Sequence, residues 1–164
     1  MAEKEVSLEI SVLLQHGFRY AISLTHDHHQ AEDILQDAWL AVMKAGGPHS
    51  KAYLFSAVRS RFLNANKRAN LVSIVILDDV EELEDKLLDT EVDFDVNGGV
   101  LEIALSQLRD VEREVLFLFA VEGYTAQEIA VLTERPRGTV LSLLHRGRKK
   151  IRRFVDQHDA KVML

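Results

Sequence analysis

Apolar residues recur every three or four positions along most of the chain, which is the rhythm of amphipathic helices. In the first half, this pattern predicts helices over residues 6–24, 28–44 and 51–70. We expect an irregularity in the first helix at Gly17, and Asp27 is placed to cap the second. Gly46, Gly47 and Pro48 end the second helix, because two glycines and a proline cannot sustain helical geometry.

The helical rhythm returns after residue 100 and predicts a pair of helices that ends at Gly123. The apolar positions of this pair are Leu101, Ala104, Leu105, Leu108, Val115, Leu116 and Phe119. A short helix follows, and its start carries a capping box in which Thr125 and Glu128 each accept from the other's backbone N–H. Proline keeps the residue before it out of helical geometry, so the chain turns at Glu134-Arg135-Pro136 before a last helix.

The last helix has two unlike sides. Its inward stripe consists of Val140, Leu144, Gly147, Ile151 and Phe154. Its polar and cationic side consists of Ser142, His145, Arg146, Lys149, Arg152 and Arg153. Two helices joined by a short turn, the second with such an outer face, are typical of a helix-turn-helix. A basic helix end can also merely complement its own dipole, but Arg137 near the other end is not explained in that way.

Between the two halves lies an apolar, β-branched run at residues 71–77, followed by a strongly acidic run at residues 78–95. The apolar run has no second strand to pair with, so we expect it to pack on a helix of the first domain or on a partner. Like charges repel, so the acidic run is expected to be a linker with at most a short helix around residues 80–88. The predicted fold class is all-α, with two small helical domains at residues 1–70 and 100–164 and an acidic linker at residues 71–99.

The formal net charge of −6 is unevenly distributed. Residues 70–100 hold one Lys or Arg against ten Asp or Glu, whereas residues 134–155 hold eight basic residues and one acidic residue. A local basic patch of this kind is what contact with DNA requires. Residues 51–70 add aromatic side chains among cations, which suits single-stranded nucleic acid because bases stack on rings while cations follow phosphates. For Phe62, the alternative to stacking on a base is a place in the hydrophobic core.

Composition removes several other classes of protein. The hydrophobic content of 47% supports folded cores, and the absence of cysteine excludes a disulfide framework, a thiolate metal site and a thiol nucleophile. No apolar run is long enough to span a membrane and no leader precedes the first helix, so we expect a cytoplasmic protein. His26, His28 and His29 suggest a metal, but no carboxylate set completes a site. They are interpreted as solvated loop residues, and no metal or cofactor is predicted.

Two blocks of the sequence resemble one family. Residues 104–154 carry L-x-x-x-E-R near their start, E-G-Y-T-x-x-E-I-A at the entry to the helix-turn-helix, and G-T-V-x-S-x-L-x-R-x-R in the last helix. Residues 31–68 contain AEDILQDAWL and AYLFSAVRSRFLNANKR. These blocks resemble regions 4 and 2 of bacterial sigma factors of the extracytoplasmic-function (ECF) group, and two matching blocks are stronger than either one.

The resemblance implies that the last helix reads the −35 promoter element through the major groove. The implied contacts are Arg137, Thr139, Leu141, Ser142, His145, Arg146, Arg148 and Lys149, with Arg146 as the best candidate for a guanine or phosphate. For recognition and melting of the −10 element the implied residues are Ser60, Arg61, Asn64, Lys67 and Arg68. Many members have asparagine and aspartate at Ser60 and Asn64, and basic residues at Leu141 and Leu143. The preferred DNA sequence is therefore not implied, and Leu141 meets either a thymine methyl or a protein partner.

The resemblance also implies that the first domain docks on core RNA polymerase. Asp33, Gln36 and Asp37 are the implied contacts to the clamp of the β′ subunit, with Leu35 as packing support, and the β flap is a second docking surface. The loop at residues 46–50 corresponds to a pocket for a flipped promoter base. An anti-sigma protein that holds both domains is the further implied partner.

The resulting hypothesis is a two-domain ECF-type sigma factor without catalytic chemistry of its own. Such a protein binds core polymerase, directs it to −10 and −35 promoter elements and initiates transcription of a specific regulon. The alternative is a sigma-like decoy or adaptor that binds polymerase or a regulator without productive promoter recognition. A hydrolytic enzyme or metal protein centred on residues 26–29 lacks a nucleophile, a base and an oxyanion site.

Overall fold

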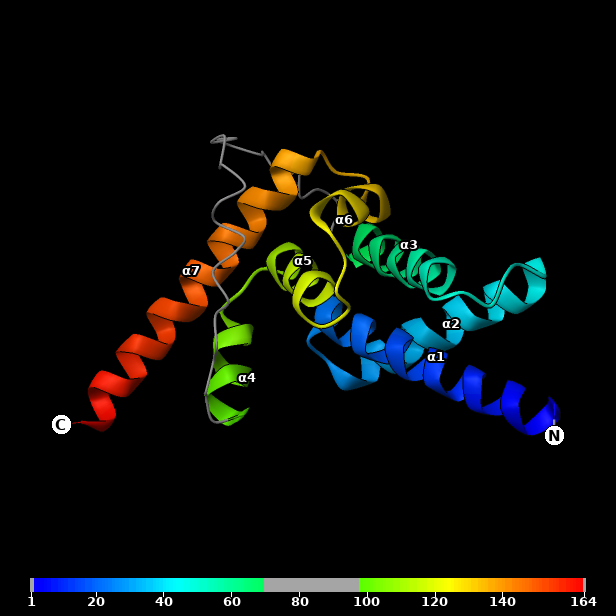
Figure 1. Ribbon diagram of the computed structural model, residues 1–164, viewed down its shortest axis with the longest axis horizontal. Coiled ribbons are helices and arrows are strands. Elements are labelled where there is room, and N and C mark those ends of the chain that lie inside the picture. The colour runs from blue at the N-terminus through cyan, green and yellow to red at the C-terminus, as the bar shows by residue number, and fades with distance from the viewer. Residues whose placement is uncertain (1, 70–97, 164) are drawn as a thin grey trace. The chain divides into compact units, whose positions relative to one another are not determined.

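A computed structural model describes residues 2–69 and 98–163 of the protein (Figure 1). These residues form seven α-helices and, within the described ranges, no strand. The chain divides into two compact units, one within residues 1–76 and the other within residues 77–164. The predicted all-α class is therefore confirmed. The apolar run at residues 71–77 and the short helix expected around residues 80–88 lie outside the described residues, and the domain boundaries stay predictions.

The first unit is a bundle of three helices, α1 (Ala2–Thr25), α2 (His28–Ala45) and α3 (Lys51–Ala69), each of which packs on the other two. Every helix contributes one apolar side to a shared core, as the sequence spacing predicts. The buried side chains include Tyr20, Ala21 and Leu24 of α1, Ala31, Ile34, Ala38 and Val42 of α2, and Leu54, Phe55, Val58 and Phe62 of α3. The rings of Tyr20 and Phe55 stack with their centroids 4.6 Å apart.

Gly17 lies inside an unbroken α1, so the expected irregularity at this position is wrong. Gly17 is needed for close packing and not for an unusual backbone conformation. A Cβ atom at Gly17 would lie 2.8 Å from Leu35 of α2 and 2.8 Å from Leu54 of α3. The missing side chain lets both leucines approach the α1 backbone, and the three helices meet there.

The two breaks in the first unit follow the predicted chemistry. Asp27 caps α2, and its side chain accepts a 2.9 Å hydrogen bond from the N–H of Gln30. Gly46 ends α2 in the left-handed conformation, with φ 60°, and donates its N–H to the carbonyl of Met43. Glycine suits this position because it carries no Cβ to oppose a positive φ.

The second unit consists of α4 (Gly98–Ser106), α5 (Asp110–Ala120), α6 (Ala126–Thr133) and α7 (Arg137–Val162). Helix α7 is the long axis of this unit, and α4, α5 and α6 all pack on it (Figure 1). Helix α4 begins at Gly98, slightly before residue 100, after which the helical rhythm of the sequence returns. The first turn of a helix has no intrahelical partners for its N–H groups, and glycines are tolerated there more readily than in the middle.

None of the helices in the described ranges combines the length and the apolar character needed to cross a membrane.

Candidate nucleic-acid interface

Helix α6 begins with the capping box that its sequence predicts. The Thr125 hydroxyl accepts from the Glu128 N–H at 3.2 Å, and the Glu128 carboxylate accepts from the Thr125 N–H at 2.8 Å. Two N–H groups that would otherwise lack a partner are thus satisfied. The start of α6 is fixed locally, and Ala126, Ile129 and Ala130 are buried.

A tight turn joins α6 to α7. Glu134 ends α6 in the left-handed conformation, with φ 53° and ψ 40°, and its N–H donates to the carbonyls of Ala130 and Val131. Pro136 then precedes α7, which begins at Arg137. This arrangement confirms the helix-turn-helix that the capping box and the proline predict.

The inward stripe of α7 packs closely on α5. Val140, Leu144, Gly147 and Ile151 are buried, as the spacing predicts. A Cβ atom at Gly147 would lie 2.7 Å from the Leu116 side chain of α5. The two helices therefore pack closely at the position where α7 lacks a side chain, and this contact sets the distance between α7 and α5.

The residues assigned to the −35 element differ in accessibility. Arg137 and Lys149 are exposed, and His145, Arg146 and Arg148 are half-buried. Thr139, Leu141 and Ser142 are buried, with Ser142 only 6% exposed. Ser142 was expected on the polar outer side, so its burial differs from the simple helical-wheel prediction. A side chain that reads a base edge must be accessible, and Leu141 and Ser142 meet this condition only once they are uncovered.

The hydroxyl of Ser142 has an unusual environment for a buried polar group. Its Oγ has no hydrogen-bond partner among the residues that the structure describes. Buried polar atoms are nearly always paired, because leaving one unpaired costs about 1–3 kcal/mol.

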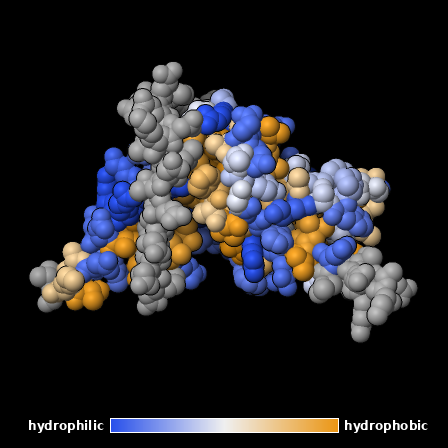
Figure 2. Space-filling view, in the orientation of Figure 1, coloured by the Kyte–Doolittle hydropathy of each residue, from blue (hydrophilic) through white to orange (hydrophobic). Residues whose placement is uncertain are grey.

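Arg148 is held by α5. Its guanidinium lies over the ring of Phe119, 4.9 Å from the centroid. Burial lowers the pKa of Arg148, and the positive charge of Arg152 lowers it further. An arginine remains charged at neutral pH even so, and the side chain is a fixed cation beside the helix-turn-helix. In Figure 2, the visible surface of α7 is largely hydrophilic, with hydrophobic side chains near its carboxyl-terminal end, where Val162 and Met163 are exposed.

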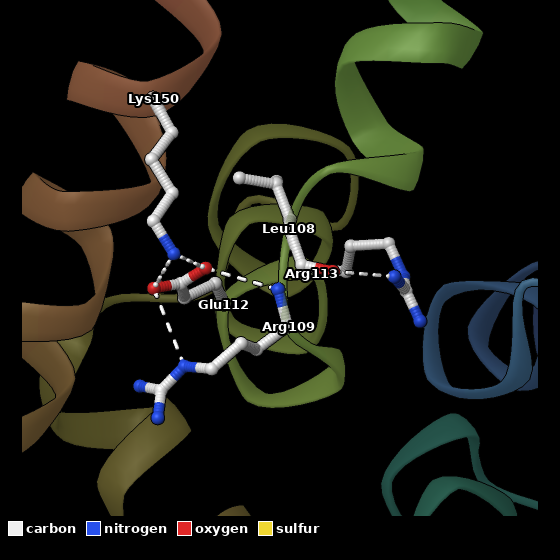
Figure 3. Close-up of polar contacts among 5 residues, drawn as sticks. All are labelled: Leu108, Arg109, Glu112, Arg113 and Lys150. Carbon is white, nitrogen blue, oxygen red and sulfur yellow. Dashed lines mark hydrogen bonds and ion pairs between the residues drawn. The ribbon is translucent and has the colours of Figure 1, made fainter.

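Sequence reasoning missed two buried carboxylates on α5, Glu112 and Glu114, which are 1% and 2% exposed. Glu112 accepts from the Lys150 ammonium of α7 at 2.8 and 2.9 Å, and Figure 3 shows Lys150 and Arg109 on two sides of this carboxylate. Glu114 accepts from Arg135 in the turn at 2.9 Å. One signal could have found Glu112, because it shares the helical face of Leu108, Val115 and Leu116, where a charge is out of place.

The residues assigned to the −10 element lie together on α3. The five side chains are exposed and follow one another at positions 60, 61, 64, 67 and 68. This spacing places them on one side of the helix, opposite the buried Phe55 and Phe62. Phe62 is in the core, as its alternative interpretation held. Lys67 and Arg68 also lie in the last turn, where cations complement the helix dipole.

Aromatic rings surround the loop between α2 and α3. The Trp39 and His49 rings lie 5.4 Å apart, and a Cβ atom at Gly47 would lie 2.7 Å from the Tyr53 ring. The Tyr53 N–H donates to the Ser50 hydroxyl at 3.2 Å. The loop is thus packed against rings on both adjoining helices.

The residues assigned to polymerase docking lie on α2. Asp33, Gln36 and Asp37 are exposed on the side opposite the buried Ile34 and Ala38. Leu35 is half-buried and lies against the α1 backbone at Gly17. The three polar side chains share one accessible surface.

The histidines near the start of α2 are exposed. His28 contacts the Phe18 ring edge-on at 4.9 Å, and its Nδ1 lies 3.5 Å from Glu32. Across residues 2–69 and 98–163, no three side chains of His, Asp or Glu are arranged to hold a metal ion.

Two all-helical units, one carrying a basic α7, define a helix-turn-helix protein. Residues 12–71 match the family model for sigma-70 region 2, and residues 100–151 match the model for sigma-70 region 4. The ECF RNA polymerase sigma factor SigL of Mycobacterium tuberculosis is 27% identical over 141 residues, which cover 82% of this chain and 80% of SigL. The chain belongs to the sigma-70 family, in the group of ECF sigma factors.

Two further relatives carry the same description. SigX of Bacillus subtilis is 25% identical over 150 residues, which cover 85% of this chain and 77% of SigX. SigE of Mycolicibacterium smegmatis is 24% identical over 151 residues, which cover 88% of this chain but only 59% of SigE.

A solved structure shares the fold. It is the sigma factor RpoE of Bartonella quintana in complex with the anti-sigma factor NepR, with a TM-score of 0.66 and 22% sequence identity. The match covers 93% of this chain and 98% of the RpoE chain.

Proposed function

We propose that the protein binds core RNA polymerase, recognises a −10 and a −35 promoter element and initiates transcription of a specific set of genes. The observation that carries this proposal is a basic helix-turn-helix in the part of the chain that matches sigma-70 region 4, together with a match to region 2 in the other unit. The protein performs no catalysis itself and acts with polymerase in the cytoplasm.

In this proposal α7 enters the major groove of the −35 element. Arg146 and His145 contact base edges, while Arg137, Arg148 and Lys149 hold the phosphate backbone. Thr139 is buried in the free protein and joins the phosphate contacts only once it is exposed. Leu141 and Ser142 join the base contacts once exposed. The buried hydroxyl of Ser142 supports this role, because a base edge would supply the hydrogen-bond partner that it lacks within residues 2–69 and 98–163.

Helix α3 recognises and opens the −10 element. Its exposed row of Ser60, Arg61, Asn64, Lys67 and Arg68 supplies polar groups for bases and cations for phosphates. The rings of Trp39, His49 and Tyr53 beside the α2–α3 loop support a place for an unstacked base, since bases stack on aromatic side chains.

Both units bind core RNA polymerase in this proposal. Asp33, Gln36 and Asp37 of α2 contact the clamp of the β′ subunit, and the second unit binds the β flap. We further infer that an anti-sigma protein restrains the chain, because the RpoE of similar fold is bound by one.

Two measurements test the proposal. The first is co-purification with core polymerase, in which Asp33→Ala and Asp37→Ala should weaken binding while Glu9→Ala, an exposed acidic residue of α1, should not. The second is selection of duplexes from a randomised promoter library by the reconstituted holoenzyme. Enrichment of a paired −35 and −10 sequence is the expected result. Stable polymerase binding with no enriched sequence contradicts the proposal and favours the decoy.

A further inference from the structure

Helix α5 packs behind the helix-turn-helix and carries two carboxylates that are almost completely buried. Glu112 is 1% exposed and Glu114 is 2% exposed. A buried carboxylate is costly unless it is paired, and both pair with a cation of the helix-turn-helix segment. The Glu114 contact connects α5 to the turn of the helix-turn-helix, and the Glu112 contact connects α5 to the middle of α7. The two contacts therefore have different effects on the position of α7.

Glu114 is connected to the turn. The Arg135 Nη1 donates to Glu114 Oε2 at 2.9 Å, and the Arg135 backbone N–H donates to the carbonyl of Ala130 at 3.0 Å. Arg135 stands between Glu134, in the left-handed conformation, and Pro136, which precedes α7. The Arg135 guanidinium therefore attaches the turn at residues 134–136 to α5, and this turn sets the direction of α7.

Glu112 is connected to the middle of α7. Its two oxygens accept from the Lys150 ammonium at 2.9 and 2.8 Å, and Oε2 also accepts from the Arg109 N–H at 3.0 Å (Figure 3). One turn before Lys150, Gly147 brings α7 close to Leu116. This second contact fixes the distance between α7 and α5, but it lies further along α7 than the residues assigned to base contacts.

We propose that Glu114 and Arg135 are positioning residues that set the direction of the base-reading end of α7; this inference rests on the proposed function. Leu141, Ser142, His145 and Arg146 all lie within the first ten residues of α7, next to the turn that Arg135 fastens. A hydrogen bond to a base edge needs its donor within a few tenths of an ångström, whereas attraction to phosphate tolerates displacement. Loosening the turn should therefore reduce sequence discrimination more than overall attraction to DNA.

Because Glu114 is negatively charged, electrostatics and positioning predict opposite changes in DNA affinity when this residue is replaced. Replacing Glu114 with methionine removes a negative charge, so simple electrostatics predicts stronger binding to any duplex. Positioning predicts weaker binding to the preferred −35 sequence. The ratio of the two affinities separates these effects, because a uniform gain in attraction cancels in it.

The experiment uses the full chain in holoenzyme with core polymerase. The wild-type holoenzyme first selects a preferred promoter from a randomised library, and affinity is then measured for that promoter and for one with a scrambled −35 element. We expect Glu114→Met and Arg135→Met to reduce the affinity ratio about tenfold, comparable to losing one good base contact. Glu102→Met, which removes an exposed carboxylate of α4, is the matched control and should leave the ratio unchanged.

A double variant separates positioning from folding. Removing one member of a buried ion pair can unfold a domain, whereas replacing both members with apolar residues of similar size is often tolerated. The Glu114→Met, Arg135→Met chain should show a helical circular-dichroism spectrum and cooperative melting like the wild type, yet keep the tenfold loss in the ratio. A folded double variant with the wild-type ratio overturns the inference. A wild-type holoenzyme that selects no sequence overturns the proposed function itself, and the inference with it.

Discussion

The ammonium of Lys150 lies between the two oxygens of Glu112, at 2.9 and 2.8 Å, and so joins the middle of α7 to the start of α5. The same carboxylate caps α5 through the Arg109 N–H. Lys150→Met removes the main cation beside a carboxylate that is almost completely buried, although Arg109 remains. We expect the free energy of unfolding to fall by about 2 kcal/mol, since hydrogen bonds to charged groups contribute about 1.5–3 kcal/mol.

Urea denaturation of the full chain measures this loss. Lys161→Met is the control, because it removes the same charge from an exposed position in the last turn of α7 and should change stability by less than about 0.5 kcal/mol. Equal effects of the two substitutions would show that net charge, and not the contact with Glu112, matters.

Ser142→Ala should raise stability and lower promoter affinity. Alanine removes a buried hydroxyl that has no hydrogen-bond partner in the described part of the chain, and it has a higher helix propensity, so we expect the free energy of unfolding to rise by about 1 kcal/mol. The control is Ser23→Ala, because the Ser23 hydroxyl is also buried but donates to the Tyr20 carbonyl at 2.6 Å. Ser23→Ala should bring no gain. A loss of stability in Ser142→Ala would mean that the hydroxyl has a partner in solution.

Gly17→Val should destabilise the three-helix unit. A valine side chain has no room beside Leu35 and Leu54, and overpacking of this kind typically costs about 1–3 kcal/mol. Gly99→Val is the matched control, since a Cβ atom at Gly99 meets nothing within 4 Å. Thermal melting of both variants checks the expectation. A Gly17 variant as stable as the Gly99 variant would contradict the close approach of the helices.

Glu134→Gly should stabilise the helix-turn-helix. Glu134 has φ 53°, and the left-handed conformation costs a residue with a Cβ about 1–2 kcal/mol. Glycine avoids that cost but loses more entropy on folding, so the net gain expected is about 0.5–1 kcal/mol. Gly123→Ala tests the same physics in reverse, because Gly123 has φ 71° and open space around it. Gly123→Ala should lower the melting temperature. An unchanged melting temperature in both the Glu134 and the Gly123 variant would contradict the assigned backbone conformations.

Local signals in the sequence predicted much of the fold. The Asp27 cap, the Thr125–Glu128 capping box and the turn at Pro136 depend on neighbouring residues, so their outcomes could be expected from residue order. The inward stripe of α7 followed from helical spacing for the same reason. Features that depend on residues far apart were not predictable in this way.

Gly17 and Glu114 show what local reasoning lacks. A glycine within a helix reads as a weak point, and only the positions of Leu35 and Leu54 on other helices reveal a close contact. Glu114 reads as part of a charged sequence, and its partner Arg135 stands 21 positions away. The burial of Ser142 has the same origin, because periodicity on one helix does not say what covers its other side.

The central claim is that both units act together in promoter-directed transcription. Run-off transcription with core RNA polymerase on a promoter library tests it most directly, with the wild-type chain compared with Arg146→Ala and Asp33→Ala. We predict defined transcripts from the wild type and a loss of about tenfold or more in the Arg146 variant, the size expected for one base contact. The Asp33 variant should lose transcripts through weaker polymerase binding. A wild-type chain that binds polymerase but yields no transcript from any promoter in the library would contradict the account.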